Sequence, residues 1–169
     1  VRSDTMVLAK QIIESMEQWA PPHYAESWDN VGLMVGSKQR DVSKIITTLD
    51  ITPEVIEYAI VEQAQMIISH HPFIFKGLKS LHLDSPQGTL IEKLIKNDIV
   101  VYSAHTNLDI TIGGLNDMLA NRLGLTNVRG FVPTGSDMVY KITTFVPTDT
   151  ADAVREAMAS AGAGRIGNY

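Results

Sequence analysis

Histidine and carboxylate side chains follow three apolar segments of this chain, at the point where each segment ends. In chain order these residues are Asp50, His70, His71, His105 and Asp109. Imidazole and carboxylate groups are the usual protein ligands of zinc and iron, and they also suit manganese, cobalt and nickel. The residue types therefore predict a site for divalent metal ions, with zinc and iron as the first candidates.

The apolar segments that precede these residues have the composition of buried strands. They cover residues 44–49, 66–69 and 99–104, and helical patterns that begin after Thr52 and at about residue 89 separate them. Such an alternation predicts an α/β fold with a parallel-type sheet flanked by helices. Because the carboxyl ends of parallel strands meet at one edge of a sheet, we expect the candidate ligands to gather there.

Further elements flank this strand and helix alternation. An amphipathic helix is expected over about residues 5–19, a short buried strand over residues 31–36, and a helix over residues 115–123. Together with the central segments they form a domain that we predict to span residues 1–135.

After residue 135 the pattern restarts. We expect a strand over residues 140–146 and a helix over residues 151–161. One strand and one helix cannot bury their own apolar faces. Residues 136–169 are therefore predicted to be the first βα unit of a second, apparently incomplete module.

The adjacent pair His70-His71 allows a geometric prediction. Neighbouring side chains of an extended backbone point to opposite sides, and Pro72 favours an extended conformation at His71. We therefore expect the two rings to diverge and to serve different ions of a two-metal site, with Asp109 as an oxygen ligand. The alternative is that the pair only hydrogen-bonds loop carbonyl groups.

Three other residues could support the site or line a substrate pocket. His105 is either a ligand or a residue that orients one, and Asn107 lies in the same segment. Asp50 has a second interpretation, because it also begins a good helix-start turn before Thr52. The remaining histidines, His23 and His82, are expected at the surface.

Composition excludes several classes of function. The 169 residues contain no cysteine, which rules out disulfides, thiolate catalysis and cysteine-ligated metal sites. A net charge of -5 argues against broad electrostatic binding of nucleic acid. No spanning segment or signal peptide is visible, so we expect a cytoplasmic protein without a membrane partner.

Three motifs in unbroken order resemble the NIF-three-like dinuclear metal-centre family, whose members are often called GTP cyclohydrolase 1 type 2 homologs. They are residues 24–33 (YAESWDNVGL), residues 69–72 (SHHP) followed by residues 75–77 (FKG), and residues 105–109 (HTNLD). The resemblance runs from about residue 6 to residue 133. The agreement of three spacings makes it much more specific than any one motif.

The resemblance implies a centre with two divalent metal ions. By motif position His70, His71 and Asp109 match its ligands, whereas Asp50 does not match one. The family also draws a His and a Glu from a segment near its C-terminus, and nothing in these 169 residues matches that segment. Assembly into a homo-hexameric ring is a further implication.

The last part of the chain is similar to the start of the PII/CutA-like module that longer family members contain. Residues 139–169 resemble its opening βα unit, and the sequence stops where the next strand should begin. A truncated chain is therefore our expectation.

Two functions compete at this point. The resemblance implies a metal-dependent hydrolase of a nucleotide-like small molecule, although no triphosphate-binding loop is recognisable in the sequence. The alternative is a non-enzymatic, ring-shaped scaffold or regulator whose second module senses a metabolite or a partner protein.

Overall fold

The computed structural model describes residues 6–131 and 140–164 of the chain, and a four-stranded sheet is its centre. The strands are β2 (Gly32–Val35), β4 (Ile45–Thr48), β5 (Met66–Ser69) and β6 (Val100–Ser103), in the order β2-β6-β5-β4. Strands β4, β5 and β6 are parallel, and β2 runs antiparallel to β6. The predicted α/β fold is confirmed, with one antiparallel edge strand added.

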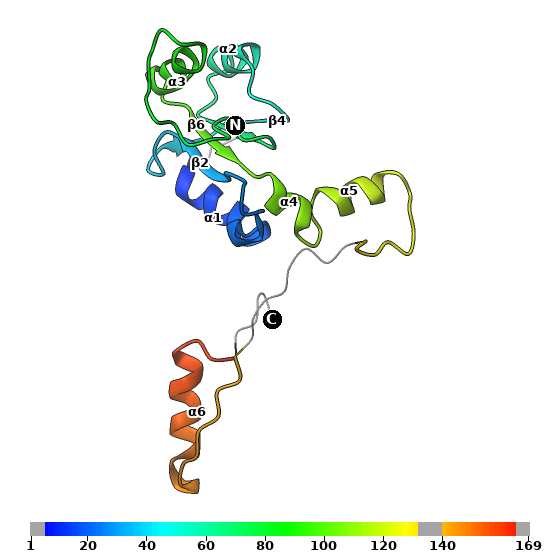
Figure 1. Ribbon diagram of the computed structural model, residues 1–169. Helices are drawn as coiled ribbons and strands as arrows, with labels where there is room; N and C mark the ends of the chain where they lie inside the picture. Colours follow the sequence, from blue (N-terminus) through cyan, green and yellow to red (C-terminus); the bar gives the residue numbers. More distant parts are fainter. Residues whose placement is uncertain (1–5, 132–139, 165–169) are drawn as a thin grey trace, which may run out of the picture. The chain divides into compact units, whose positions relative to one another are not determined.

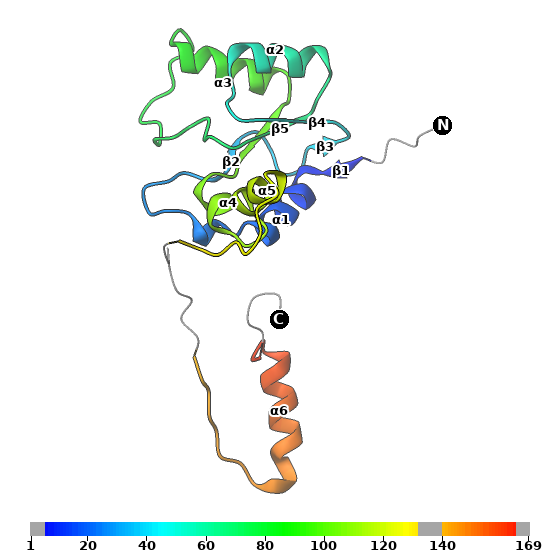
Figure 2. The ribbon, with the colours of Figure 1, turned by 90° about the vertical axis from the view of Figure 1, so that its right-hand side faces the viewer.

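Helices cover both faces of the sheet. Helices α2 (Pro53–Val61) and α3 (Pro86–Lys96) lie on one face, and α1 (Ala9–Trp19) lies on the other (Figures 1 and 2). The shorter α4 (Thr106–Ile110) and α5 (Leu115–Arg122) follow β6 on the side of α1.

The two-residue alternation of the strands divides the core into two clusters. Ile67 and Val101 pack with residues of α2 and α3. Their neighbours Met66, Val100 and Tyr102 point to the opposite face and pack with α1. Because both faces are covered, the central strands β5 and β6 are buried at almost every position, as expected inside a parallel sheet.

Local sequence explains where the helices begin. The Thr52 hydroxyl accepts a hydrogen bond from the Val55 N–H, and Pro53 occupies the first turn, where its missing N–H has no cost. The Ser85 hydroxyl accepts from the Gly88 N–H in the same way at the start of α3. Helix α3 therefore begins at Pro86, three residues earlier than its apolar pattern predicts.

The first helix begins later than predicted. Residues 7 and 8 form β1 (Val7–Leu8), which pairs antiparallel with β3 (Asp41–Val42). Pairing with a strand more than 30 residues away overrides the local helical pattern. A local pattern carries no information about such a distant partner. A short 3-10 helix, η1 (Pro22–Tyr24), and α4 are also absent from the sequence-based expectation.

The chain divides into two compact units, residues 1–131 and 132–169. In the second unit, η2 (Thr148–Thr150) leads into α6 (Ala151–Ser160), close to the predicted helix. The predicted strand over residues 140–146 is wrong, because this segment has no strand pairing. A strand needs a neighbour for its backbone groups, and no other strand lies within residues 140–164.

Two expectations about the second unit stay predictions. The proposed boundary at residues 135 and 136 lies outside the described residues, and the similarity to a PII/CutA-like module is not tested by one helix. Within the described part of the chain, no helix is both long and apolar enough to cross a membrane.

Candidate metal centre

The ends of the three parallel strands lie in one row. Thr48, Ser69 and Ser103, the last residues of β4, β5 and β6, are register partners of one another. The segments that follow them begin at the same edge, since the His70 N–H donates to the Thr48 carbonyl oxygen at 3.1 Å. This edge is where parallel sheets bind ligands.

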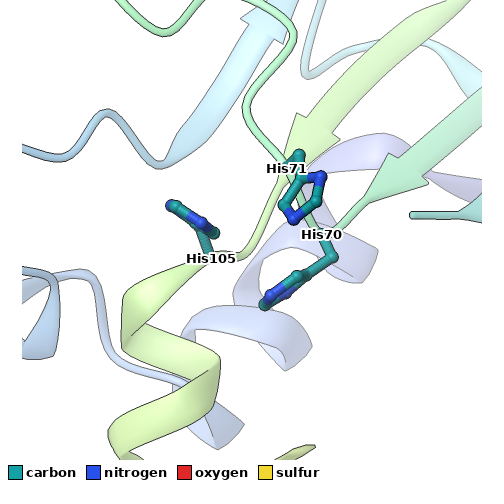
Figure 3. Close-up of side chains that lie close together, drawn as sticks. All are labelled: His70, His71 and His105. Carbon is teal, nitrogen blue, oxygen red and sulfur yellow. The ribbon is translucent and has the colours of Figure 1, made fainter. Parts of the chain in front are cut away.

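Three histidines meet at this edge. His70, His71 and His105 each offer a ring nitrogen, and these three atoms lie within 4.8 Å of one another. Their ring centroids are 5.1 to 5.6 Å apart. Figure 3 shows that two rings follow β5 and that the third lies just after β6. The structure thus places His105 beside the pair, which sequence spacing alone left open.

The predicted divergence of His70 and His71 is wrong. Their ring centroids are 5.2 Å apart and both rings border the same space. The reason is that β5 ends at Ser69 and the backbone bends at both histidines, so strand alternation no longer applies. The buried Ser69 hydroxyl donates to the His71 carbonyl oxygen at 2.8 Å, which stabilises this bend.

All three imidazoles are held through the same ring atom. Nδ1 of His70 lies 3.0 Å from the Ala104 carbonyl oxygen, Nδ1 of His71 lies 2.7 Å from Asp50 Oδ1, and Nδ1 of His105 lies 2.9 Å from Asp29 Oδ1. Because these partners are acceptors, each Nδ1 carries the proton. In the neutral imidazole with this tautomer, each Nε2 has a free lone pair, which is the state that a metal ligand requires.

Asp29 is the most completely buried carboxylate of the centre. Its side chain has 0% exposure, and it accepts hydrogen bonds from the Thr106 N–H and hydroxyl, from His105 and from the Asn30 N–H. Burial by itself raises the pKa of this carboxyl, but the hydrogen bonds from Thr106 and His105 outweigh it and hold the pKa below its ordinary value. Asp29 is thus a charged anchor for His105.

Asp109 faces the cluster from the first turn of α4. Its Oδ1 lies 3.7 Å from Nε2 of His70, too far for a hydrogen bond but across the same space. A carboxylate oxygen there adds a fourth donor to the three imidazoles. Its predicted role as a metal ligand stays a prediction.

The other two candidates support histidines. Asp50 contacts Nδ1 of His71, and both side chains are about half exposed. Asn107 is fully buried, accepts from the His105 N–H at 2.9 Å and donates to the Ala20 carbonyl oxygen at 2.7 Å. Asn107 therefore fixes the backbone of His105. His23 and His82 are exposed, as expected.

Sequence reasoning missed Asp29. It precedes His105 by 76 residues, in a segment that the sequence describes only as a turn. Its position inside the first of the three motifs was the available signal, but no local pattern pairs it with a histidine.

The residues present fit a divalent metal ion. Three imidazoles with free Nε2 atoms and one carboxylate form a donor set of the kind that zinc and iron sites use. The hydrogen-bonded Nδ1 atoms supply the orienting contacts that metal-binding histidines have in known sites.

Comparison with known proteins decides the family. A family model described as Duf34/NIF3 (NGG1p interacting factor 3) matches residues 7–169. The chain belongs to the Duf34/NIF3 family. This confirms the resemblance drawn from the three motifs, and it extends over nearly the whole chain.

Curated Duf34/NIF3 relatives carry the name GTP cyclohydrolase 1 type 2 homolog. The chain is 44% identical over 158 residues to the one from Halalkalibacterium halodurans, covering 94% of this chain and 42% of the relative. It is 44% identical over 163 residues to the one from Bacillus subtilis, covering 96% and 44%. The chain therefore spans less than half the length of these relatives.

Solved structures show the same Duf34/NIF3 fold. A Bacillus cereus protein related to NIF3 has a TM-score of 0.74 and 40% identity, covering 98% of this chain and 46% of the other. Reduced HcgD from Methanocaldococcus jannaschii has a TM-score of 0.70 and 36% identity, covering 78% and 52%. The arrangement of strands and helices described above is thus the family's own.

Proposed function

We propose that this chain supplies part of a divalent-metal centre and that the complete protein is a metal-dependent hydrolase of a nucleotide-like substrate. The observation that carries the metal proposal is the common orientation of His70, His71 and His105, each held through Nδ1 with its Nε2 free. Hydrogen bonding to a loop carbonyl group, the alternative role, accounts for His70 but not for His71 and His105, whose Nδ1 atoms contact carboxylates.

A bound metal would supply Lewis acidity and an activated water near neutral pH. The protein's own residues supply the rest. His70, His71 and Asp109 are proposed as ligands, and His105 lies close enough to join them. Asp29 and Asp50 hold two of the rings in the required tautomer.

The number of ions and the substrate class rest on the family. Curated relatives are named GTP cyclohydrolase 1 type 2 homologs, which supports a nucleotide-like substrate. Two metals per complete protein and assembly into a hexameric ring stay part of the proposal. Further ligands would come from outside the residues present here, since the chain covers 42% of the Halalkalibacterium halodurans relative.

Elemental analysis of protein purified without added metal is the direct test. We expect bound zinc or iron in the chain, and its loss in His71→Ala and in Asp109→Ala. His82→Ala, an exposed histidine outside the cluster, is the matched control and should retain the metal. Equal metal content in all four proteins would refute the proposed centre.

Activity separates the hydrolase from the scaffold. Metal-dependent turnover of a nucleotide panel, abolished by His71→Ala, supports the enzyme. Binding of a partner protein without turnover of any nucleotide supports the regulator.

A further inference from the structure

Two aromatic side chains beside the histidine cluster are exposed to solvent. Trp28 is 58% exposed and Phe75 is 45% exposed. Their ring centroids are 6.0 Å apart and their planes meet at 52°. The two rings are therefore near neighbours that do not stack on each other, which leaves aromatic surface available to a third ring.

The Trp28 ring also adjoins the proposed metal centre. Its centroid lies 6.2 Å from that of His105, with the two planes at 76°. Phe75 lies beyond Trp28 in the loop that follows His71. A planar group resting on Trp28 would thus lie next to the imidazoles.

Hydrogen bonds on both sides of the pair hold it in place. Asn30 donates through Nδ2 to the Ile74 carbonyl oxygen at 2.5 Å, which ties the turn after Trp28 to the residue before Phe75. Asp29, directly after Trp28, is tied to Thr106 at the start of α4. The pair is therefore preformed, and a ligand would not have to order it.

We propose that Trp28 and Phe75 bind the planar nitrogen heterocycle of a nucleotide beside the metal centre. This inference rests on the proposed function and assigns the base of its nucleotide-like substrate. Aromatic side chains stack on any nucleobase, because every base has a π face. Lys76 follows Phe75 directly and is exposed, so the loop that carries Phe75 also carries a positive charge, which favours an anionic ligand such as a nucleotide.

Self-association is the competing use of these side chains. Leu78, Leu81 and Leu83 on the same loop are also exposed, and a second copy of the chain could cover them. The proximity of Trp28 to His105 favours the heterocycle, because a planar group on this ring would lie beside the proposed metal ligands. Measurement of the molar mass separates the two uses.

Fluorescence reports on Trp28 directly. The chain has two tryptophans, so Trp19→Phe leaves Trp28 as the only one. GTP should quench its emission, and inorganic triphosphate, which carries the charge without a ring, should not. Quenching should occur in metal-free protein as well, since stacking needs no metal.

Calorimetry with GTP then tests the pair. Trp28→Leu and Phe75→Leu should each weaken binding about tenfold, a typical cost of removing one stacking partner. Tyr58→Leu, an equally exposed aromatic on α2, is the matched control and should bind GTP with unchanged affinity. Light scattering should give one molar mass for all variants.

Three outcomes overturn the inference. They are no GTP binding by the unaltered chain, an affinity in both leucine variants equal to that of the unaltered chain, and a change of molar mass in those variants. Metal content measured on the same samples keeps this test apart from that of the metal centre. A chain that binds no metal but still shows ring-dependent quenching refutes the centre alone, and a metal-loaded chain that is indifferent to both leucine substitutions refutes the aromatic site alone.

Discussion

Asp29 Oδ1 lies 2.9 Å from Nδ1 of His105, although 76 residues separate the two in sequence. The carboxylate is buried and His105 is partly buried, and this pair joins the turn after η1 to the start of α4. It orients one of the three imidazoles and at the same time connects two segments of the fold. Substitutions at Asp29 should therefore affect both metal affinity and stability.

Replacing Asp29 by Asn should weaken zinc binding about tenfold, the typical effect of losing a carboxylate behind a metal-binding histidine. Asn keeps the shape of the side chain but loses the charge that favours the Nδ1 proton. Competition with a chromophoric chelator measures the affinity. Asp84→Asn, an exposed carboxylate in the loop before α3, serves as control. An unchanged affinity would show that Asp29 has only a structural role.

Replacing Asp50 by Asn should have a much smaller effect. The contact between Asp50 and His71 is shorter, at 2.7 Å, but the two side chains are 57% and 46% exposed. Exposed pairs contribute about 0.2 to 1 kcal/mol, so zinc affinity should fall by at most about fivefold. The same chelator titration compares the two variants. A larger loss of zinc affinity for Asp50→Asn than for Asp29→Asn would contradict the prediction that Asp29 contributes more to metal binding.

Replacing Tyr102 by Phe should stabilise the protein. The Tyr102 hydroxyl is buried and has no hydrogen-bond partner in the described part of the chain. An unpaired buried hydroxyl costs about 1 to 3 kcal/mol, so the free energy of unfolding should rise by about 1 kcal/mol at pH 7. Urea denaturation measures the change. A decrease would reveal a partner that the described residues do not include.

Tyr102 should also make stability fall at high pH. Burial raises its pKa to about 12, with a further contribution from Glu17, against 10.0 for the ordinary group. Because the folded state binds the proton more tightly, stability is fully present below pH 10 and declines as pH rises to about 12. The loss at pH 12 is about 2 kcal/mol. Tyr102→Phe should remove this part of the alkaline transition, and an identical pH profile would contradict the assignment.

Replacing Asn107 by Ala should destabilise the fold strongly. Its buried side chain pairs with the His105 N–H and with the Ala20 carbonyl oxygen, and both would lose their partner. With about 1 to 3 kcal/mol for each of these two unpaired groups, we expect a loss of about 2 to 6 kcal/mol in urea denaturation. Asn116→Ala removes an exposed hydrogen bond to the Asp109 carbonyl oxygen and should cost far less. Equal losses of stability in the two variants would mean that burial does not decide the cost of removing these hydrogen bonds.

Residue patterns predicted the strands and most helices of the first unit because these elements are specified locally. Apolar runs define β5 and β6. The start of α2 is marked by Pro53 and by Thr52, whose hydroxyl accepts a hydrogen bond from within the first turn. Elements that depend on a distant partner escaped prediction. Residues 7 and 8 form a strand because Val42 and Asp41 lie beside them. Residues 140–146 form none, and residues 140–164 contain no strand with which they could pair.

The sequence by itself determined which side chains are candidate metal ligands and the edge of the sheet at which they gather. The types of His70, His71 and Asp109 and the strands before them are readable from the chain, and the family follows from the same motifs. Only the tertiary structure decided how the rings face one another. The burial of Asp29 against His105 is a long-range packing event. The bend after Ser69 ends the alternation of the strand, so side-chain direction beyond it has no period from which it can be read.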